Sequence, residues 1–99
     1  MNVEQLSTVL TAAASPQRML IVAELAGGEV HISELARRVN MSRALLYMHL
    51  AKLEAAVFVT TRLTLSEEGT ALKLVALQPF SYVLDADAVV SAVQRSGGK

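Results

Sequence analysis

The stretch from Ser33 to Val57, SELARRVNMSRALLYMHLAKLEAAV, constrains the fold more than any other part of the chain. Its apolar residues recur every three or four positions, which is the period of a helix and not of a strand. The spacing predicts a short helix over 33–39 and a longer helix over 42–56. Between them, Asn40 suits the left-handed conformation that ends a helix, and the Ser42 hydroxyl can cap the next one. Two helices joined by such a turn form a helix-turn-helix, whose second helix enters the major groove of DNA.

Several short motifs in and before this stretch resemble one known family. They are Ser15-Pro16-Gln17-Arg18 at the start of a predicted helix, Glu34-Leu35-Ala36, Met41-Ser42, His49-Leu50 and Leu53-Glu54. Together they resemble the arsenical-resistance-repressor (ArsR) type of winged helix-turn-helix regulators, over roughly residues 15–77. The resemblance implies a mainly α fold with a small β-hairpin, dimeric through its terminal helices. It also implies a sequence-specific transcription regulator that binds double-stranded DNA as a homodimer, with the helix at about 42–56 in the major groove.

The charge distribution agrees with a nucleic-acid partner, although the net charge is zero. From Arg37 to Arg62 there are five cations and one anion, whereas the remaining residues carry four cations and eight anions. A basic segment on the helix-turn-helix is the pattern expected for docking on phosphates. An ordinary solvated helical face would also carry such charges, so the motif decides in favour of DNA.

A single domain, 1–99, is expected from the length, since domains typically have about 100–150 residues. The chain has no Cys and only two His, so we expect no metal and no cofactor. No stretch approaches the ~20 apolar residues of a membrane span, and no secretory signal is visible. We expect a soluble, cytoplasmic protein that is not an enzyme, because no nucleophile–base pair, glycine-rich phosphate loop or pair of carboxylates is present.

The two ends of the chain are expected to join two copies. At 53% hydrophobic, the chain carries more apolar side chains than a domain of this size buries alone. Helices are predicted over about 2–14 and 86–94, with Asn2 and Asp85 as caps, and 96–99 is predicted to be a frayed tail. The resemblance implies that the segments 1–14 and 85–95 form the dimer interface. The alternative is that the first helix packs on its own domain. The expected interface residues are Val3, Leu6, Val9, Leu10, Val89, Val90 and Val93.

Between the first helix and the helix-turn-helix, Ser15-Pro16 predicts the start of a second helix, because Pro suits the first helical position. Gly27-Gly28 is expected to end it. A short strand is predicted at 29–32, pairing with the hairpin. The residues of this helix that are expected to be buried are Met19, Leu20, Val22, Ala23 and Leu25.

After the helix-turn-helix, the segment 58–65, FVTTRLTL, has the β-branched content of a strand. The segment 70–77 is predicted to return as the second strand of a β-hairpin, the wing. A helix over 69–77, as in the related multiple-antibiotic-resistance regulators, is the alternative; Gly69 and Pro79 favour the hairpin. Arg62 and Lys73, one on each strand, can each reach a phosphate or remain solvated.

Eight residues are predicted to contact DNA. Arg43, near the start of the longer helix, can pair with a guanine edge or hold a phosphate, and Lys52 can hold a phosphate. Tyr47 can contact a phosphate or a thymine methyl group, or pack in the core, and Met48 is expected to fill the core. In the family, the His at position 49 faces DNA or makes a local hydrogen bond. The predicted set is Arg38, Ser42, Arg43, Leu45, Tyr47, His49, Lys52 and Arg62.

Val57 departs from the family pattern, which commonly has Gly after the recognition helix. That Gly supplies a left-handed conformation, which a β-branched residue resists. Either Val57 is strained, or the helix ends with negative φ and Val57 packs under the wing. The apolar run 55–59 favours the packed version, in which Val57→Gly lowers stability.

A winged-helix module that binds a protein partner and no DNA is the competing functional hypothesis. Binding to duplex DNA that weakens with salt separates the two, because phosphate docking releases counterions. The sequence specifies neither the operator, nor activation or repression, nor a small-molecule effector.

Overall fold

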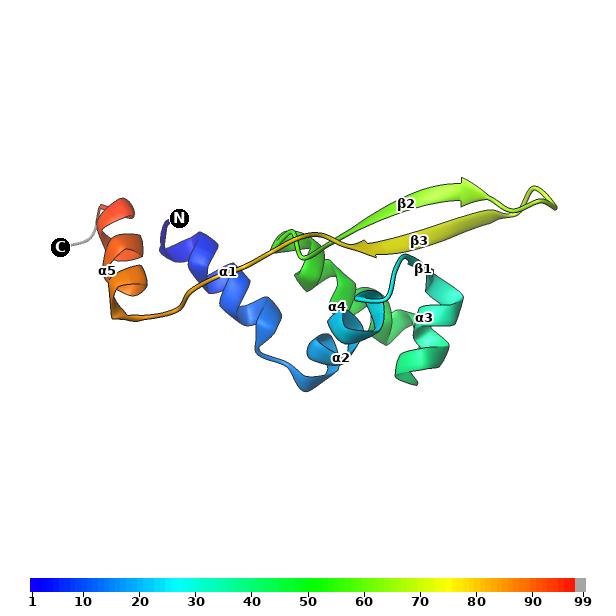
Figure 1. The fold of residues 1–99 in the computed structure, drawn as a ribbon, viewed down its shortest axis with the longest axis horizontal. Helices are drawn as coiled ribbons and strands as arrows, with labels where there is room; N and C mark the ends of the chain where they lie inside the picture. Colours follow the sequence, from blue (N-terminus) through cyan, green and yellow to red (C-terminus); the bar gives the residue numbers. More distant parts are fainter. Residues whose placement is uncertain (98–99) are drawn as a thin grey trace.

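The computed structural model describes residues 1–97 and shows five helices and a three-stranded antiparallel sheet (Figure 1). Gly98 and Lys99, which end the expected 1–99 domain and its frayed tail, lie outside the described residues. The hairpin expected at 58–77 is confirmed, and the alternative helix at 69–77 is not formed. The elements, in chain order, are α1 Val3–Ala13, α2 Pro16–Leu25, β1 Val30–His31, α3 Ile32–Val39, α4 Arg43–Ala55, β2 Val59–Leu65, β3 Ala71–Leu77 and α5 Ala86–Arg95.

Polar caps set the starts of the helices. The side chains of Asn2, Ser15, Ser42 and Asp85 each accept a hydrogen bond from a backbone N–H in the first turn of the helix that follows. The start of α3 differs from the prediction, since the helix begins at Ile32 and not at Ser33. There His31 Nδ1 accepts from the Glu34 N–H at 3.4 Å. The predicted start was therefore one residue too late, and the additional helical residue, Ile32, is buried.

Both helices of the helix-turn-helix end in the same backbone motif. After α3, the Met41 N–H bonds to Ala36 O and the Asn40 N–H to Arg37 O, with Asn40 at φ 54°. This is a Schellman arrangement, in which a left-handed residue lets two amides satisfy the last carbonyls of the helix. The left-handed conformation predicted for Asn40 is confirmed.

The same motif ends α4, with Val57 in the left-handed position at φ 59°. The Phe58 N–H bonds to Leu53 O and the Val57 N–H to Glu54 O, both at 2.9 Å. The Val57 side chain is 62% exposed, whereas Phe58 is buried. The expectation of a packed Val57 with negative φ was therefore wrong. The turn that brings Phe58 into the core forces its neighbour outward.

The core lies where the helix-turn-helix meets α2 and the base of the sheet. Its most deeply buried side chains are Ile21, Leu25, Leu35, Leu46, Leu50, Leu53, Val59 and Val75. The prediction for α2 was partly wrong, because Met19, Leu20 and Ala23 are exposed. The buried stripe of α2 instead consists of Arg18, Ile21 and Leu25, which are spaced as one helical face.

The sheet has the order β1-β3-β2, and β3 pairs with both other strands. Val75 at its centre lies opposite Val30 of β1 and Thr61 of β2. The short strand expected before α3 therefore pairs with the hairpin, as predicted. Beyond this base, β2 and β3 continue as a two-stranded ribbon that projects away from the helices (Figure 1).

The described chain is elongated, with extents of 57 × 23 × 23 Å. The hairpin lies at one end and α1 with α5 at the other, joined by the connector 78–85, which returns past α1 (Figure 1). The terminal helices contact each other, and the Val3 N–H donates to Ser96 Oγ at 2.9 Å. The connector is fixed at its start by Phe80, whose ring stacks on Phe58 with centroids 4.2 Å apart.

Replacing Val57 by Gly should raise the free energy of unfolding. A non-Gly residue in the left-handed region costs of order 1 kcal/mol or more, and the exposed side chain loses little burial. The entropy that Gly adds to the unfolded chain offsets part of this. Val57→Ala is the matched variant, since it keeps a Cβ and should recover only part of the gain. Urea unfolding compares the three proteins, and a Gly variant less stable than wild type would show that Val57 is not strained.

Candidate nucleic-acid interface

The recognition helix α4 buries one face and exposes another. Leu46, Leu50 and Leu53 fix the buried face in the core. At its start, Ser42 Oγ accepts from the Leu45 N–H at 3.1 Å and caps the first turn, where Ser42, Arg43 and Ala44 are exposed. The exposed side chains along α4 include Arg43, Tyr47, Met48 and Lys52. Met48 is 56% exposed, so its expected role as core filler was wrong; Leu45 is half-buried.

A groove of about 410 Å³ separates the start of α4 from the wing. Its charged side chains are Arg43 and Lys73, and the residues that line it include no Asp or Glu. The Arg43 guanidinium donates to Ser33 Oγ. Neither Arg43 nor Lys73 forms an ion pair with any residue from 1 to 97. The complete lining is His31, Ile32, Ser33, Arg43, Tyr47, Leu63, Thr70, Ala71, Leu72 and Lys73.

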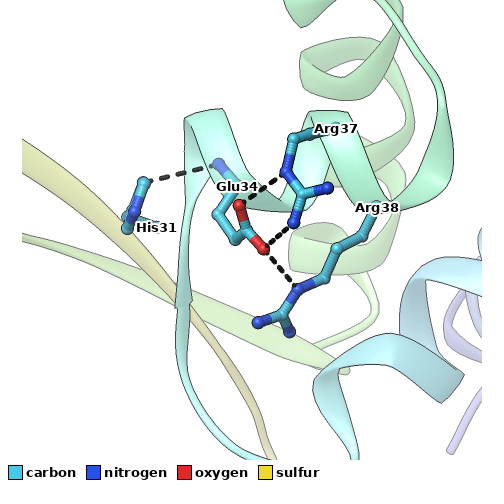
Figure 2. A network of polar contacts seen from close by, with 4 residues as sticks. All are labelled: His31, Glu34, Arg37 and Arg38. Atoms are coloured by element: carbon cyan, nitrogen blue, oxygen red, sulfur yellow. Dashed lines mark hydrogen bonds and ion pairs between the residues drawn. The ribbon is translucent and has the colours of Figure 1, made fainter.

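Arg38, in the predicted contact set, belongs to an ion-pair network on α3 (Figure 2). Glu34 accepts from Arg37 Nε at 2.9 Å, from a second Arg37 nitrogen at 2.5 Å and from Arg38 Nε at 2.9 Å. The hydrogen bonds from Arg37 and then Arg38 lower the pKa of Glu34 from 4.5 to about 2. One carboxylate thus offsets part of the charge of two arginines. Glu34 lies just outside the segment in which the cations were counted from the sequence.

Arg62 is paired in a similar way. Its Nε and one terminal nitrogen donate to the two carboxylate oxygens of Glu29, at 3.0 and 2.8 Å. This two-pronged contact raises the pKa of Arg62 and joins β2 to the residue just before β1. The predicted phosphate contact of Arg62 therefore competes with an existing carboxylate.

His49 lies in the interior, 6% exposed, and not on the open face of α4. Its Nδ1 is 3.0 Å from an Arg18 terminal nitrogen. Because a guanidinium only donates, Nδ1 accepts and the ring is neutral, with its proton on Nε2. Burial first, and then the charges of Arg18 and Lys52, lower the pKa of His49. Of the two family roles, the local hydrogen bond is the one formed, so we remove His49 from the proposed contact set.

Sequence reasoning missed the role of Arg18. Its guanidinium also donates to Thr11 O and Ala12 O, both at 2.9 Å, and so satisfies carbonyls at the end of α1. The resemblance at 15–18 included this residue. Its spacing to Ile21 and Leu25, which places it on the buried stripe, was the signal that could have identified it.

The remaining predicted residues lie apart from this groove. Lys52 lines a second groove, between α4 and α1, of about 500 Å³.

Among the expected dimer residues, Val3, Leu10, Val89 and Val90 are exposed, Leu6 and Val93 are half-buried, and Val9 is buried in the core. Among the described residues, no helix is long and apolar enough to span a membrane, and no three His, Asp or Glu side chains cluster as metal ligands.

The Arg18–His49 contact should make stability depend on pH. The unfolded chain takes up a proton at His49 near pH 6.5, whereas the folded chain resists it. Stability should therefore be complete above this pH and fall as the pH drops from 6.5 towards the lowered folded pKa. The loss from Glu34, whose folded pKa is about 2, begins only below its ordinary value of 4.5 and ends as the pH falls through about 2.

Urea unfolding at several pH values from 8 to about 5 measures this effect. His49→Gln is the control, because its amide oxygen can accept from Arg18 without titrating, and it should flatten the curve in this window. An unchanged pH dependence in this variant would assign the window to another group.

The comparisons with known proteins concern the same region. A family model described as "Bacterial regulatory protein, arsR family" matches residues 15–61. The nodulation protein NolR of Rhizobium meliloti is 42% identical over 53 residues, which cover 54% of this chain and only 43% of that protein.

Solved structures match over nearly the whole chain. NolR from Sinorhizobium fredii is 26% identical with a TM-score of 0.62, over 97% of this chain and 88% of that one. The homodimeric winged helix-turn-helix DNA-binding domain of a possible ArsR-family transcriptional regulator from Mycobacterium bovis has the same fold, with 20% identity and a TM-score of 0.65, over 96% of this chain and 80% of that one. In fold and in the matched helix-turn-helix, the chain is therefore similar to the winged helix-turn-helix regulators of the ArsR family.

Proposed function

We propose that this protein is a sequence-specific regulator that binds double-stranded DNA as a homodimer and acts by binding, not by catalysis. The groove between α4 and the wing carries the proposal, since its charged side chains are two cations and its lining includes no carboxylate. A surface of this kind attracts a polyanion and repels few of its charges. The site of action would be the cytoplasm, where bacterial DNA lies.

The start of α4 supplies the proposed contacts to bases. The first turn, capped by Ser42, is exposed, and Arg43 in that turn lines the groove. A guanidinium can pair in two-pronged fashion with the edge of a guanine. Its present partner, the Ser33 hydroxyl, is neutral and exchangeable, so the charge of Arg43 remains available to DNA.

The homodimer is supported by the opposite end of the molecule. Exposed apolar side chains gather on α1 and α5, and the connector beside them adds Tyr82, Val83 and Leu84. Monomeric proteins seldom expose so many neighbouring apolar groups. The NMR structure from Mycobacterium bovis is homodimeric. With two copies, the recognition helices would enter successive major grooves about 34–36 Å apart on a pseudo-palindromic operator.

Selection of bound fragments from genomic DNA tests the proposed function. Arg43→Ala should weaken the selected duplex by about 1–3 kcal/mol and relax preference at one operator position, if Arg43 pairs with a base. A uniform loss on all sequences would leave Arg43 as a phosphate contact. If the wild-type protein shows no salt-dependent affinity for duplex DNA, the protein-binding module is the better hypothesis.

Charged substitutions on the terminal helices test the dimer. Val90→Glu and Leu10→Glu place a carboxylate on exposed apolar positions, so they should give folded monomers that lose operator binding. Leu65→Glu, at the exposed last residue of β2, is the control and should remain dimeric, because the hairpin and the terminal helices lie at opposite ends of the molecule (Figure 1). Light scattering measures the mass, and a monomeric wild type at concentrations where it binds DNA would overturn the proposed assembly.

A further inference from the structure

Two side-chain contacts, on opposite faces of the wing, join it to the rest of the chain near the point where its pairing with β1 ends. Backbone pairing with β1 stops at Leu74 and Val75. On one face Lys73 of β3 contacts Tyr47 of α4, and on the other Arg62 of β2 binds Glu29. The faces differ because strand side chains alternate: Lys73 shares its face with the buried Val75, whereas Arg62 is paired with Leu74.

The Tyr47–Lys73 contact holds a cation without neutralising it. Lys73 Nζ lies 4.7 Å from the centre of the Tyr47 ring, within the distance of a cation–π contact. A carboxylate, such as Glu29 beside Arg62, cancels the charge that it binds. An aromatic face attracts the ammonium through its quadrupole and leaves the net charge at +1. Lys73 is therefore positioned and still fully attractive to an anion.

Both residues line the groove that contains Arg43. Lys73 enters from the wing and Tyr47 from the recognition helix, so the pair bridges the two surfaces that a DNA strand would pass between. Half-burial of Lys73 restricts its flexible stem, and a side chain that is ordered before binding loses less entropy on binding.

We propose that Lys73 contacts a backbone phosphate of the strand lying between α4 and the wing, and that Tyr47 is the positioning residue that holds Lys73 there. This rests on the proposed DNA binding. It assigns Tyr47 a role that depends on its ring, in place of the predicted contact with a phosphate or a thymine methyl group. Binding a phosphate at Lys73 also fixes the angle between the wing and the recognition helix.

The first test needs no DNA. Protons above an aromatic ring resonate upfield, so NMR should show shifted ε-methylene protons for Lys73. The shift should persist in Tyr47→Phe, which keeps the ring, and disappear in Tyr47→Leu. If Lys73 has unshifted resonances in the wild-type protein, the Tyr47–Lys73 contact is absent and the proposal fails, whatever the protein does with DNA.

The second test is a double-mutant cycle on a duplex of mixed sequence, measured at several salt concentrations. Lys73→Gln should reduce the slope of log affinity against log salt by about one. Tyr47→Leu should weaken binding about two- to fivefold, Tyr47→Phe should bind as wild type, and Tyr47→Leu should add nothing in the Lys73→Gln background. The matched control is Arg37→Gln, which removes a cation already paired with Glu34 and should leave the slope unchanged.

The outcomes separate the two proposals. Additive effects of Tyr47→Leu and Lys73→Gln would show that the residues act independently, and an unchanged slope in Lys73→Gln would show that Lys73 meets no phosphate. Equal losses in Tyr47→Phe and Tyr47→Leu would assign the effect to the hydroxyl. A shifted Lys73 signal in a protein that binds no duplex would confirm the contact and reject DNA binding as its purpose.

Discussion

The buried guanidinium of Arg18, on α2, joins three helices through hydrogen bonds to α1 and α4. It donates to two backbone carbonyls at the end of α1 and to the His49 ring on α4. A buried cation without partners would be very costly, and these three hydrogen bonds offset that cost. Together with the apolar packing of Val9 and Ala12, this side chain holds α4 against α1, the helix that carries part of the proposed dimer surface.

The elements themselves followed from local chemistry in the sequence. Polar caps at Asn2, Ser15, Ser42 and Asp85, and the β-branched run after α4, predicted the elements because their effect is confined to a few neighbouring residues. The buried face of α2 was missed because every apolar residue was counted, although only one stripe of a helix can face the core. At Val57 the apolar run suggested burial, but the turn into buried Phe58 decided the conformation.

The candidate site was harder to predict than the fold, because charge pairing is a property of three-dimensional neighbours. Arg62 and Glu29 are far apart in the sequence, and so are Tyr47 and Lys73. Counting the charged residues from Arg37 to Arg62 predicted a positive net charge for this segment. It could not show that Glu34 and Glu29 engage three of the five, or that Lys73, outside the counted segment, completes the groove with Arg43.

The connector joins the two ends of the molecule mechanically. The Gln78 N–H bonds to Phe58 O, and Phe80 stacks on the Phe58 ring. The start of the connector is therefore bound to Phe58, which lies between α4 and β2. From there only a short extended segment leads to α5. An extended segment can lengthen very little, so a movement at one of its ends is passed on to the other. A displacement of α5 would therefore be transmitted along the connector to Phe58, at the junction between α4 and the wing. The strained backbone of Val57 is adjacent to this junction.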